Sequence, residues 1–372
     1  MIRRTLLALA ISVIATSATS SFAADAPQPI VIRPAGAVYT LSNEAIGNSV
    51  LVFDRFADGH LQPAFRTFTG GTGSGTSLGN QGGLTLTANQ RWLLAINAGS
   101  DTVSVLEVGE RSLRLVDTAK SGHVPISIAV HGDLVYVLSA GSDSIAGFRL
   151  DRTGQLHPIK GSIRKLDNVP GTQPAQIGFS PEGEFLVVTE KAADKIVTLP
   201  LHADGTTGAP LAQDSDGVSP SGFAFGKRDQ LFVSEAFLGA SNAGATSSYE
   251  LRADGVLTTI SASARNNQSG SCCTAIAPDG PFAYIANSGS GTISGYHIDF
   301  EGKLTLLDAK GVAAVTRGKP IDLAFTAAGQ FLYALVGETN AVLAYRVQPN
   351  GTLQQIGNDV GLPDSVDGLA VR

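Results

Sequence analysis

Short apolar stretches alternate with polar turns along most of the chain, and the same order of segments recurs. Each copy has an apolar strand, a tight turn, a second strand that ends in a polar residue, a short loop with Asp or Asn, a third strand, and an acid-Gly-x-Leu hairpin. The clearest copy covers residues 274–304, with turns at 278–280 and 301–302. Strands of this length separated by Gly-containing turns predict antiparallel sheets.

The residue that ends the second strand gives the period of the repeat. It falls at seven positions, which are Asn43, Asn97, Ala140, Glu190, Glu235, Asn287 and Val336. The successive separations are 54, 43, 50, 45, 52 and 49 residues, which is the length of one four-stranded propeller blade. We therefore expect an all-β fold, a seven-bladed β-propeller with four-stranded blades.

The two ends of the repeat complement each other. Residues 365–371 look like a first strand with no blade after it, and residues 38–43 look like a second strand with no first strand before it. Pairing them completes blade one and removes two exposed sheet edges. We expect residues 37–372 to form one propeller, closed by the C-terminal strand pairing into blade one.

The first residues have the order of a secretory signal peptide. Arg3 and Arg4 precede an apolar run over residues 6–15, and small polar residues follow up to Ala23. We expect a signal peptide over residues 1–23, a linker over 24–36, and a periplasmic or secreted protein. The apolar run is shorter than the roughly 20 residues that span a bilayer, so we expect no membrane span.

The amino-acid composition limits which classes of partner the protein can bind. The chain has 26 Lys and Arg against 32 Asp and Glu, a formal net charge of −6, whereas nucleic-acid binding needs clustered basic residues. With 43 glycines and 17 prolines, the chain suits many short strands and tight turns. We expect a monomer that binds a small molecule, a lactone or organic acid, and no nucleic acid.

Polar candidates gather on one face in this register, where loops enter the first strands and join the second strands to the third. The candidates are Glu190 and Glu235 as catalytic groups, and Lys191, Arg265, Gln176, Asn97, Asn287 and Asn43 as substrate-binding groups. The same residues can simply cap strands and hold channel water, and both interpretations stay open. Irregular segments at 70–83, 238–247 and 261–271 fall on the same face and favour a ligand there.

Two other motifs carry little chemistry. Ser77 stands in a Gly-x-Ser-x-Gly string, but that motif needs a strand-to-helix elbow and here lies in a Gly/Ser-rich connector. The six histidines are scattered, none has a second His or Cys at metal-ligand spacing, and only His123 approaches the candidate face. We expect no metal and no cofactor.

Cys272 and Cys273 are the only cysteines of the chain. Three interpretations stay open: two thiols packed in a first strand, a vicinal disulfide that stiffens the channel mouth, and a redox or metal role. Neighbouring Cα atoms lie about 3.8 Å apart, below the usual disulfide range of about 4.4 to 6.8 Å. A bond between these two residues is therefore strained and easily reduced.

With the blades assigned, residues 134–156, 179–201 and 276–304 resemble the seven-bladed β-propeller lactonase family, which includes propeller-type 6-phosphogluconolactonases and the fungal 3-carboxy-cis,cis-muconate cyclase. The resemblance implies that a lactone ring is opened or closed without an obligatory metal, by acid/base side chains and by basic residues that hold a carboxylate or phosphate. Glu190 in the string Val-Val-Thr-Glu-Lys matches the family's glutamate. Residues 173–176, Gln-Pro-Ala-Gln, stand where the enzymes typically have histidines, and glutamine relays no proton near neutral pH.

Two hypotheses follow. The first is an extracytoplasmic lactonase-like or cyclase-like enzyme for a small acidic lactone, with Glu190 or Glu235 as general base and Lys191 or Arg265 facing the substrate anion. The alternative is a non-catalytic exported propeller that binds a small ligand or protein partner on its loop face. A closed pocket around a glutamate favours the enzyme, and a wide, water-filled mouth favours binding.

Overall fold

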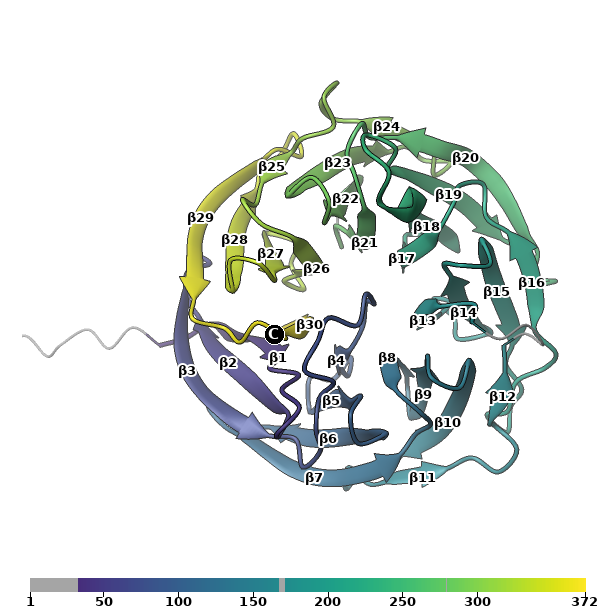
Figure 1. Cartoon of the computed structure of the whole chain (residues 1–372), viewed down its shortest axis with the longest axis vertical. Coiled ribbons are helices and arrows are strands. Elements are labelled where there is room, and N and C mark those ends of the chain that lie inside the picture. The colour runs from purple at the N-terminus through teal and green to yellow at the C-terminus, as the bar shows by residue number, and fades with distance from the viewer. Residues whose placement is uncertain (1–32, 167–170, 279) are drawn as a thin grey trace, which may run out of the picture. The chain divides into compact units, whose positions relative to one another are not determined.

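Seven antiparallel sheets stand around a common axis within residues 34–372 (Figure 1). The structure is a computed structural model that describes residues 33–166, 171–278 and 280–372. The predicted signal peptide and residues 24–32 of the predicted linker lie outside the described residues. The one helical segment among those residues is the 3-10 turn η1 (Phe237–Gly239). No helix of the described part is long and apolar enough to cross a membrane.

The blades follow one another along the chain. Blade 1 contains β30 (Asp367–Val371), β1 (Gly36–Leu41), β2 (Ser49–Arg55) and β3 (Leu61–Phe68). Blade 2 contains β4 (Leu84–Leu86), β5 (Trp92–Asn97), β6 (Thr102–Val108) and β7 (Leu113–Lys120). Blade 3 contains β8 (Pro125–His131), β9 (Leu134–Ser139), β10 (Ser144–Leu150) and β11 (Leu156–Pro158), with β12 (Arg164–Lys165) also paired to β10. Blade 4 contains β13 (Pro174–Phe179), β14 (Phe185–Glu190), β15 (Lys195–Pro200) and β16 (Leu211–Asp214).

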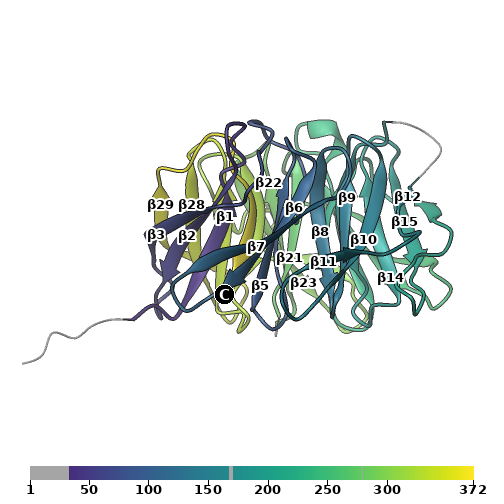
Figure 2. The ribbon, with the colours of Figure 1, turned by 90° about the horizontal axis from the view of Figure 1, so that it is seen from below.

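The last three blades repeat the order. Blade 5 contains β17 (Pro220–Phe225), β18 (Gln230–Glu235), β19 (Ala245–Leu251) and β20 (Leu257–Arg265). Blade 6 contains β21 (Ser271–Ile276), β22 (Phe282–Asn287), β23 (Thr292–Ile298) and β24 (Leu304–Leu306), with β25 (Ala314–Val315) also paired to β23. Blade 7 contains β26 (Pro320–Phe325), β27 (Phe331–Val336), β28 (Ala341–Val347) and β29 (Leu353–Val360). Seen from the side, the strands run between two faces of the ring (Figure 2).

Closure of the ring confirms the prediction made from the two chain ends. Strand β30 pairs antiparallel with β1, with Thr40 opposite Leu369. The Ser365 hydroxyl also donates a hydrogen bond to the Ser42 carbonyl at 2.7 Å. The innermost strand of blade 1 therefore comes from the C-terminus and its other three strands from the N-terminal part, so the inner edge of β1 is paired.

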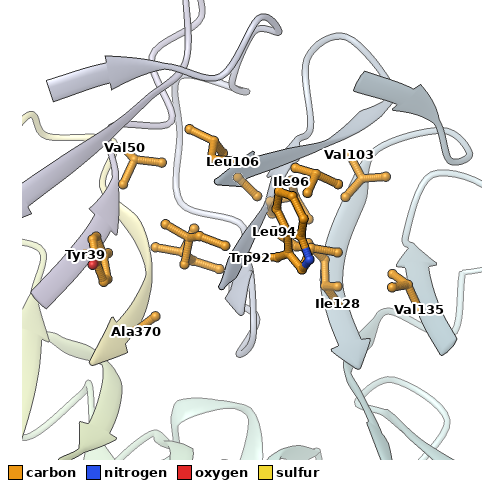
Figure 3. Close-up of a cluster of buried hydrophobic side chains, with 14 of the residues drawn as sticks. Tyr39, Val50, Trp92, Leu94, Ile96, Val103, Leu106, Ile128, Val135 and Ala370 are labelled. Atoms are coloured by element: carbon orange, nitrogen blue, oxygen red, sulfur yellow. The ribbon is translucent and has the colours of Figure 1, made fainter. Parts of the chain in front are cut away.

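Neighbouring blades pack through apolar side chains of their second strands. Trp92, Leu94 and Ile96 of β5 lie in one buried cluster with Val50 of blade 1 and Ile128 of blade 3 (Figure 3). Each such cluster joins side chains from adjacent sheets, and burial of this apolar surface is the main stabilising contribution to a blade interface.

Tyrosines of the second strands reach into the outer hairpin of the next blade. The hydroxyl of Tyr284 donates to the Gly351 carbonyl at 2.7 Å, and Tyr333 does the same to Gly59 at 2.8 Å. Gly351 has a φ of +81°, and a Cβ there would lie 2.7 Å from the Phe282 ring. The recurrent acid-Gly hairpin is therefore set both by the turn and by the close approach of the preceding blade.

First strands carry a β-bulge at the channel. In blades 3 to 7 the register with the second strand shifts directly after the first residue pair, for example between Pro174 and Gln176 and between Ser271 and Cys273. A bulge inserts an unpaired residue and re-aims the side chains next to it. Consecutive residues at these positions can therefore both face the channel.

The connection from β3 to β4 reaches into the middle of the ring (Figure 1). Its end, residues 79–83, contacts four blades. The Asn80 amide donates to the Ile126 carbonyl in blade 3 and, at 3.2 Å, to the Asp367 carboxylate in blade 1. The Gln81 backbone N–H donates to the Ala175 carbonyl in blade 4 at 3.3 Å. The Gln81 side chain also pairs with the Thr274 backbone. The irregular segment at 70–83 therefore does more than border one face, because its end fills part of the channel. We call residues 79–83 the channel segment.

Candidate functional site

The predicted register places four polar residues correctly at the ends of second strands. Asn97, Glu190, Glu235 and Asn287 end β5, β14, β18 and β22, and none of the four has exposed surface. Two other positions need correction. Strand β9 ends at Ser139, one residue before Ala140, and β1 ends at Leu41, so that Asn43 lies in the loop after it.

Asn97 and Asn287 use their amide groups inside the fold. Asn97 donates to the Ser104 hydroxyl at 2.8 Å and accepts from the Thr69 hydroxyl at 2.6 Å. Asn287 likewise donates to the Ser294 hydroxyl at 2.8 Å. These bonds hold the third strand and the connector that enters the blade, so the arrangement stabilises the blade and directs neither amide to the surface.

Glu235 lies in a cage of serines. Its carboxylate accepts hydrogen bonds from the hydroxyls of Ser247, on β19, and Ser263, on β20, the latter at 2.8 Å. Burial raises the pKa of Glu235, and the two serine bonds oppose that rise. A Cβ on Gly217 would lie 2.0 Å from Oε2 of Glu235. The carboxyl group is thus sealed inside blade 5.

Blade 4 departs from this pattern. Val197 occupies the register position on β15 that Ser104 and Ser247 occupy in blades 2 and 5. Lys191 directly follows Glu190, whereas Ala98 and Ala236 follow the corresponding residues of those blades. Blade 4 therefore has a buried carboxyl group and an ammonium group side by side in sequence at the channel mouth.

The Lys191 side chain points to the channel segment. Its Nζ donates to the Gly79 carbonyl at 2.5 Å, and the residue is only partly exposed. Burial lowers the pKa of Lys191, and the nearby thiols of Cys272 and Cys273 oppose that change. No ion pair within the described ranges involves Lys191, so its positive charge is held next to a neutral carbonyl.

Two further predicted substrate-binding residues, Gln176 and Asn43, form hydrogen bonds to backbone groups of the protein. The Gln176 amide donates to the Phe223 carbonyl at 3.0 Å and accepts from the Phe223 N–H at 2.7 Å, which joins β13 to β17. Asn43 donates to the Thr76 carbonyl at 2.8 Å and accepts from the Ser74 N–H at 2.9 Å. The hydrogen-bonding groups of both side chains are therefore used to hold backbone segments of the protein itself.

Arg265 lies at the end of β20, the outer strand of blade 5. Its guanidinium carbon is 4.1 Å from the centre of the Phe237 ring, and it donates to the Ala243 carbonyl. The predicted loops near it are shorter than expected, because β19 begins at Ala245 and β20 extends to Arg265. The structure brings Lys191, not Arg265, to the channel segment.

Two buried aspartates were not among the predicted catalytic or substrate-binding residues. Asp322 of β26 accepts from the Leu369 N–H at 2.9 Å, and Asp367 of β30 accepts from Asn80 at 3.2 Å. Burial raises the pKa of Asp367 to about 7, and burial together with the charge of Asp367 raises the pKa of Asp322 well above its usual value. An acid inside an otherwise apolar first strand was the signal that could have found both.

The described residues contain no group of three or more His, Cys, Asp or Glu side chains arranged to hold a metal ion. His123 does lie by the entry to blade 3, where its Nδ1 is 3.2 Å from the Asp101 carboxylate, and its side chain is largely exposed. Its contacts are those of a surface pair.

A family model described as "Lactonase, 7-bladed beta-propeller" matches residues 15–166 and 241–368. The chain belongs to this lactonase family. The matched ranges flank residues 167–240, and Glu190 and Lys191 lie in that unmatched stretch. The unmatched stretch of this lactonase propeller covers blade 4 and the first half of blade 5, and it includes residues 173–176, Gln-Pro-Ala-Gln, where the resemblance in sequence led us to expect histidines.

Known proteins resemble this lactonase-family chain over most of its length. The 6-phosphogluconolactonase of Bacillus subtilis (strain 168) is 26% identical over 260 residues, which cover 65% of this chain and 72% of the relative. A Bacteroides fragilis structure, assigned only provisionally as a 6-phosphogluconolactonase, has 18% identity and a TM-score of 0.72, covering 91% of this chain and 98% of its own. The Pseudomonas aeruginosa periplasmic gluconolactonase PpgL has 17% identity and a TM-score of 0.69, covering 90% and 99%. At these identities the two structures show the fold.

Proposed function

We propose that this lactonase-family propeller hydrolyses a small lactone that carries a carboxylate or phosphate, at the channel mouth next to Lys191. The position of Lys191 is the observation that carries the proposal. Its ammonium group is partly buried and bonded to the neutral Gly79 carbonyl, so an entering anion meets a positive charge in surroundings that screen it less than bulk water does.

Glu190 is the general base of this proposal. A water molecule attacks the lactone carbonyl carbon, Glu190 takes one proton from that water, and the ring C–O bond breaks as the ring oxygen is protonated to an alcohol. The product is a hydroxy acid, and general-base catalysis of this kind contributes about 10² to 10⁴ in rate. We assign the base to Glu190 and not to Glu235 because Glu190 directly precedes Lys191, which reaches the channel segment, whereas Ala236 follows Glu235.

The relatives' names support a sugar-acid lactone as substrate. Family membership and the similarity to the Bacillus 6-phosphogluconolactonase favour an aldonic lactone, and the basic side chain favours a charged one. We also propose that the protein is exported, on the signal-like order of residues 1–23. An exported enzyme meets little 6-phosphogluconolactone, a cytoplasmic metabolite, so a carboxylate-bearing lactone fits best.

The test is a lactone panel assayed by acid release with purified residues 24–372. We expect turnover of at least one anionic lactone, a loss of about 10² to 10⁴ in kcat for Glu190→Gln, and a higher KM for the anionic lactone with Lys191→Met. Glu250→Gln, an exposed carboxylate of β19, is the matched control and is expected to be neutral. A loss with Glu235→Gln and none with Glu190→Gln moves the base to blade 5. If no lactone is hydrolysed, the enzyme hypothesis is rejected and the hypothesis of a non-catalytic binding propeller remains.

A further inference from the structure

The two cysteines are brought together by the bulge of blade 6. Successive residues of a regular strand point to opposite faces of the sheet, yet the Sγ atoms of Cys272 and Cys273 lie 3.4 Å apart. The register of β21 against β22 shifts between Ser271 and Cys273, so Cys272 is the unpaired bulge residue. Both cysteines are free thiols in the structure.

Backbone carbonyls hold the pair from the neighbouring blade. The Cys272 Sγ lies 3.5 Å from the Pro320 carbonyl oxygen, and the Cys273 Sγ lies 3.0 Å from that of Ile321. Pro320 and Ile321 are the first two residues of β26 in blade 7. The two thiols are therefore fixed close to each other before any reaction, which favours bond formation between them.

The two thiols are not equivalent. Cys272 is partly exposed, whereas Cys273 is 1% exposed. The Cys273 S–H donates to Cys272 and, with Ser288 and the Lys191 ammonium, lowers the pKa of Cys272, while the same bond and burial raise the pKa of Cys273. Cys272 thus has the accessibility and the thiolate character of an attacking group, and Cys273 those of a resolving group.

We propose that Cys272 and Cys273 form a redox couple in the channel wall, which closes reversibly to a vicinal disulfide by exchange with a small-molecule disulfide. The Cys272 thiolate attacks one sulfur of the external disulfide and releases the other sulfur as a thiolate, which gives a mixed disulfide. Cys273 then loses its proton to that thiolate or to solvent and attacks Cys272 Sγ, which releases the second external thiol. Two protein thiols are oxidised and one external disulfide is reduced to two thiols.

The geometry suits this bond to reversible oxidation and not to stabilising the fold. A disulfide between neighbouring residues is strained, and strained bonds are more easily reduced. It closes a minimal loop, so it constrains the unfolded chain very little. The couple shares Lys191 with the lactonase proposal but needs neither Glu190 nor a lactone, so one proposal can fail without the other.

The test uses the purified mature protein equilibrated with mixtures of reduced and oxidised glutathione, quenched with acid, alkylated and weighed intact. We expect a form lighter by two hydrogen atoms that takes up no alkyl group, in a fraction that rises with the oxidised share. Cys273→Ser is expected to accumulate a glutathione adduct on Cys272, and Cys272→Ser to react several-fold more slowly. Two alkylated thiols at every glutathione ratio overturn the proposal, and so does an adduct on Cys273 alone.

A second measurement needs no cysteine variant. Lys191→Met is expected to slow alkylation of Cys272 at neutral pH several-fold and to leave the rate unchanged at a pH where the thiol is fully ionised, while Lys191→Arg restores the neutral rate. Equal rates for all three proteins at neutral pH overturn the role of Lys191. If the reduced protein retains one equivalent of a soft metal ion and forms no disulfide at any glutathione ratio, the redox proposal is overturned and the two cysteines are a metal site.

Discussion

The side chain of Gln81 pairs with the backbone of Thr274 in both directions. Its Nε2 donates to the Thr274 carbonyl at 3.0 Å, and its Oε1 accepts from the Thr274 N–H at 3.0 Å. The two residues are 193 positions apart and belong to the channel segment and to blade 6. Gln176 binds Phe223 in the same way between blades 4 and 5, so two glutamine side chains take the place of a neighbouring strand at bulged first strands.

Gln81→Ala is expected to lower stability and loosen the channel segment. The substitution leaves two buried backbone groups of Thr274 without their partner, at about 1 to 3 kcal/mol each. Thermal unfolding should show a lower Tm, and limited proteolysis should show faster cleavage within residues 70–83. Gln62→Ala, at an exposed position of β3, is the control. An unchanged Tm together with unchanged cleavage contradicts the role of Gln81.

The seven-blade repeat could be predicted from the sequence, but the position of the channel segment could not. Strand alternation and Gly-containing turns are local signals, and they predicted seven blades and the pairing of β30 with β1. The contact of Gln81 with Thr274 depends on ring closure between distant blades, and a Gly- and Ser-rich connector has no periodicity that could reveal it. Strands β12 and β25, of two residues each, are too short to leave a pattern.

Removal of residues 363–372 is expected to abolish cooperative folding. Blade 1 then loses its innermost strand, and Asp322 loses the Leu369 N–H that binds its buried carboxyl group. The open edge of β1 also favours aggregation. Circular dichroism and size-exclusion chromatography measure both effects. A synthetic peptide of residues 363–372, added during refolding, should restore part of the native signal, and a truncated chain with the full-length Tm contradicts the closure argument.

Gly217→Ala is expected to destabilise blade 5 by about 1 to 3 kcal/mol, as overpacking does. The added methyl group lies 2.0 Å from the Glu235 carboxylate, which is fixed by Ser247 and Ser263. Chemical denaturation measures the change. Gly47→Ala is the control, because its nearest neighbour is 3.8 Å away, on the Phe68 ring. Equal effects of the two substitutions contradict the sealed position of Glu235.

The candidate site was only partly readable from the sequence. The register correctly put Glu190 and Glu235 at equivalent strand ends, but their surroundings depend on side chains of other strands. The cage of Ser247 and Ser263 around Glu235 can be recognised only once the bulged pairing of β19 with β20 is known. Lys191 was found from its place after Glu190, whereas its contact with Gly79 crosses from blade 4 to the channel segment.

The last prediction concerns the buried carboxyl group of Asp367. Burial raises its pKa to about 7, while an aspartate in the unfolded chain titrates near 3.9. Between these values the folded state keeps a proton that the unfolded state has lost, so stability falls as pH rises through this window. The loss is complete above the folded pKa and is on the order of a few kcal/mol. Asp322 adds to it in the same direction, because its pKa is raised as well.

Asp367→Asn removes this titration and keeps an oxygen and a similar shape. We expect the wild-type Tm to fall between pH 5 and pH 8 by more than the Tm of the variant, so that the variant gains relative stability at pH 8; these pH values bracket the folded pKa of about 7. Glu301→Gln, at an exposed hairpin position, controls for the loss of one negative charge. Parallel Tm curves for wild type and Asp367→Asn would show that Asp367 is ionised in the folded protein throughout this range, and that the channel segment accommodates its charge.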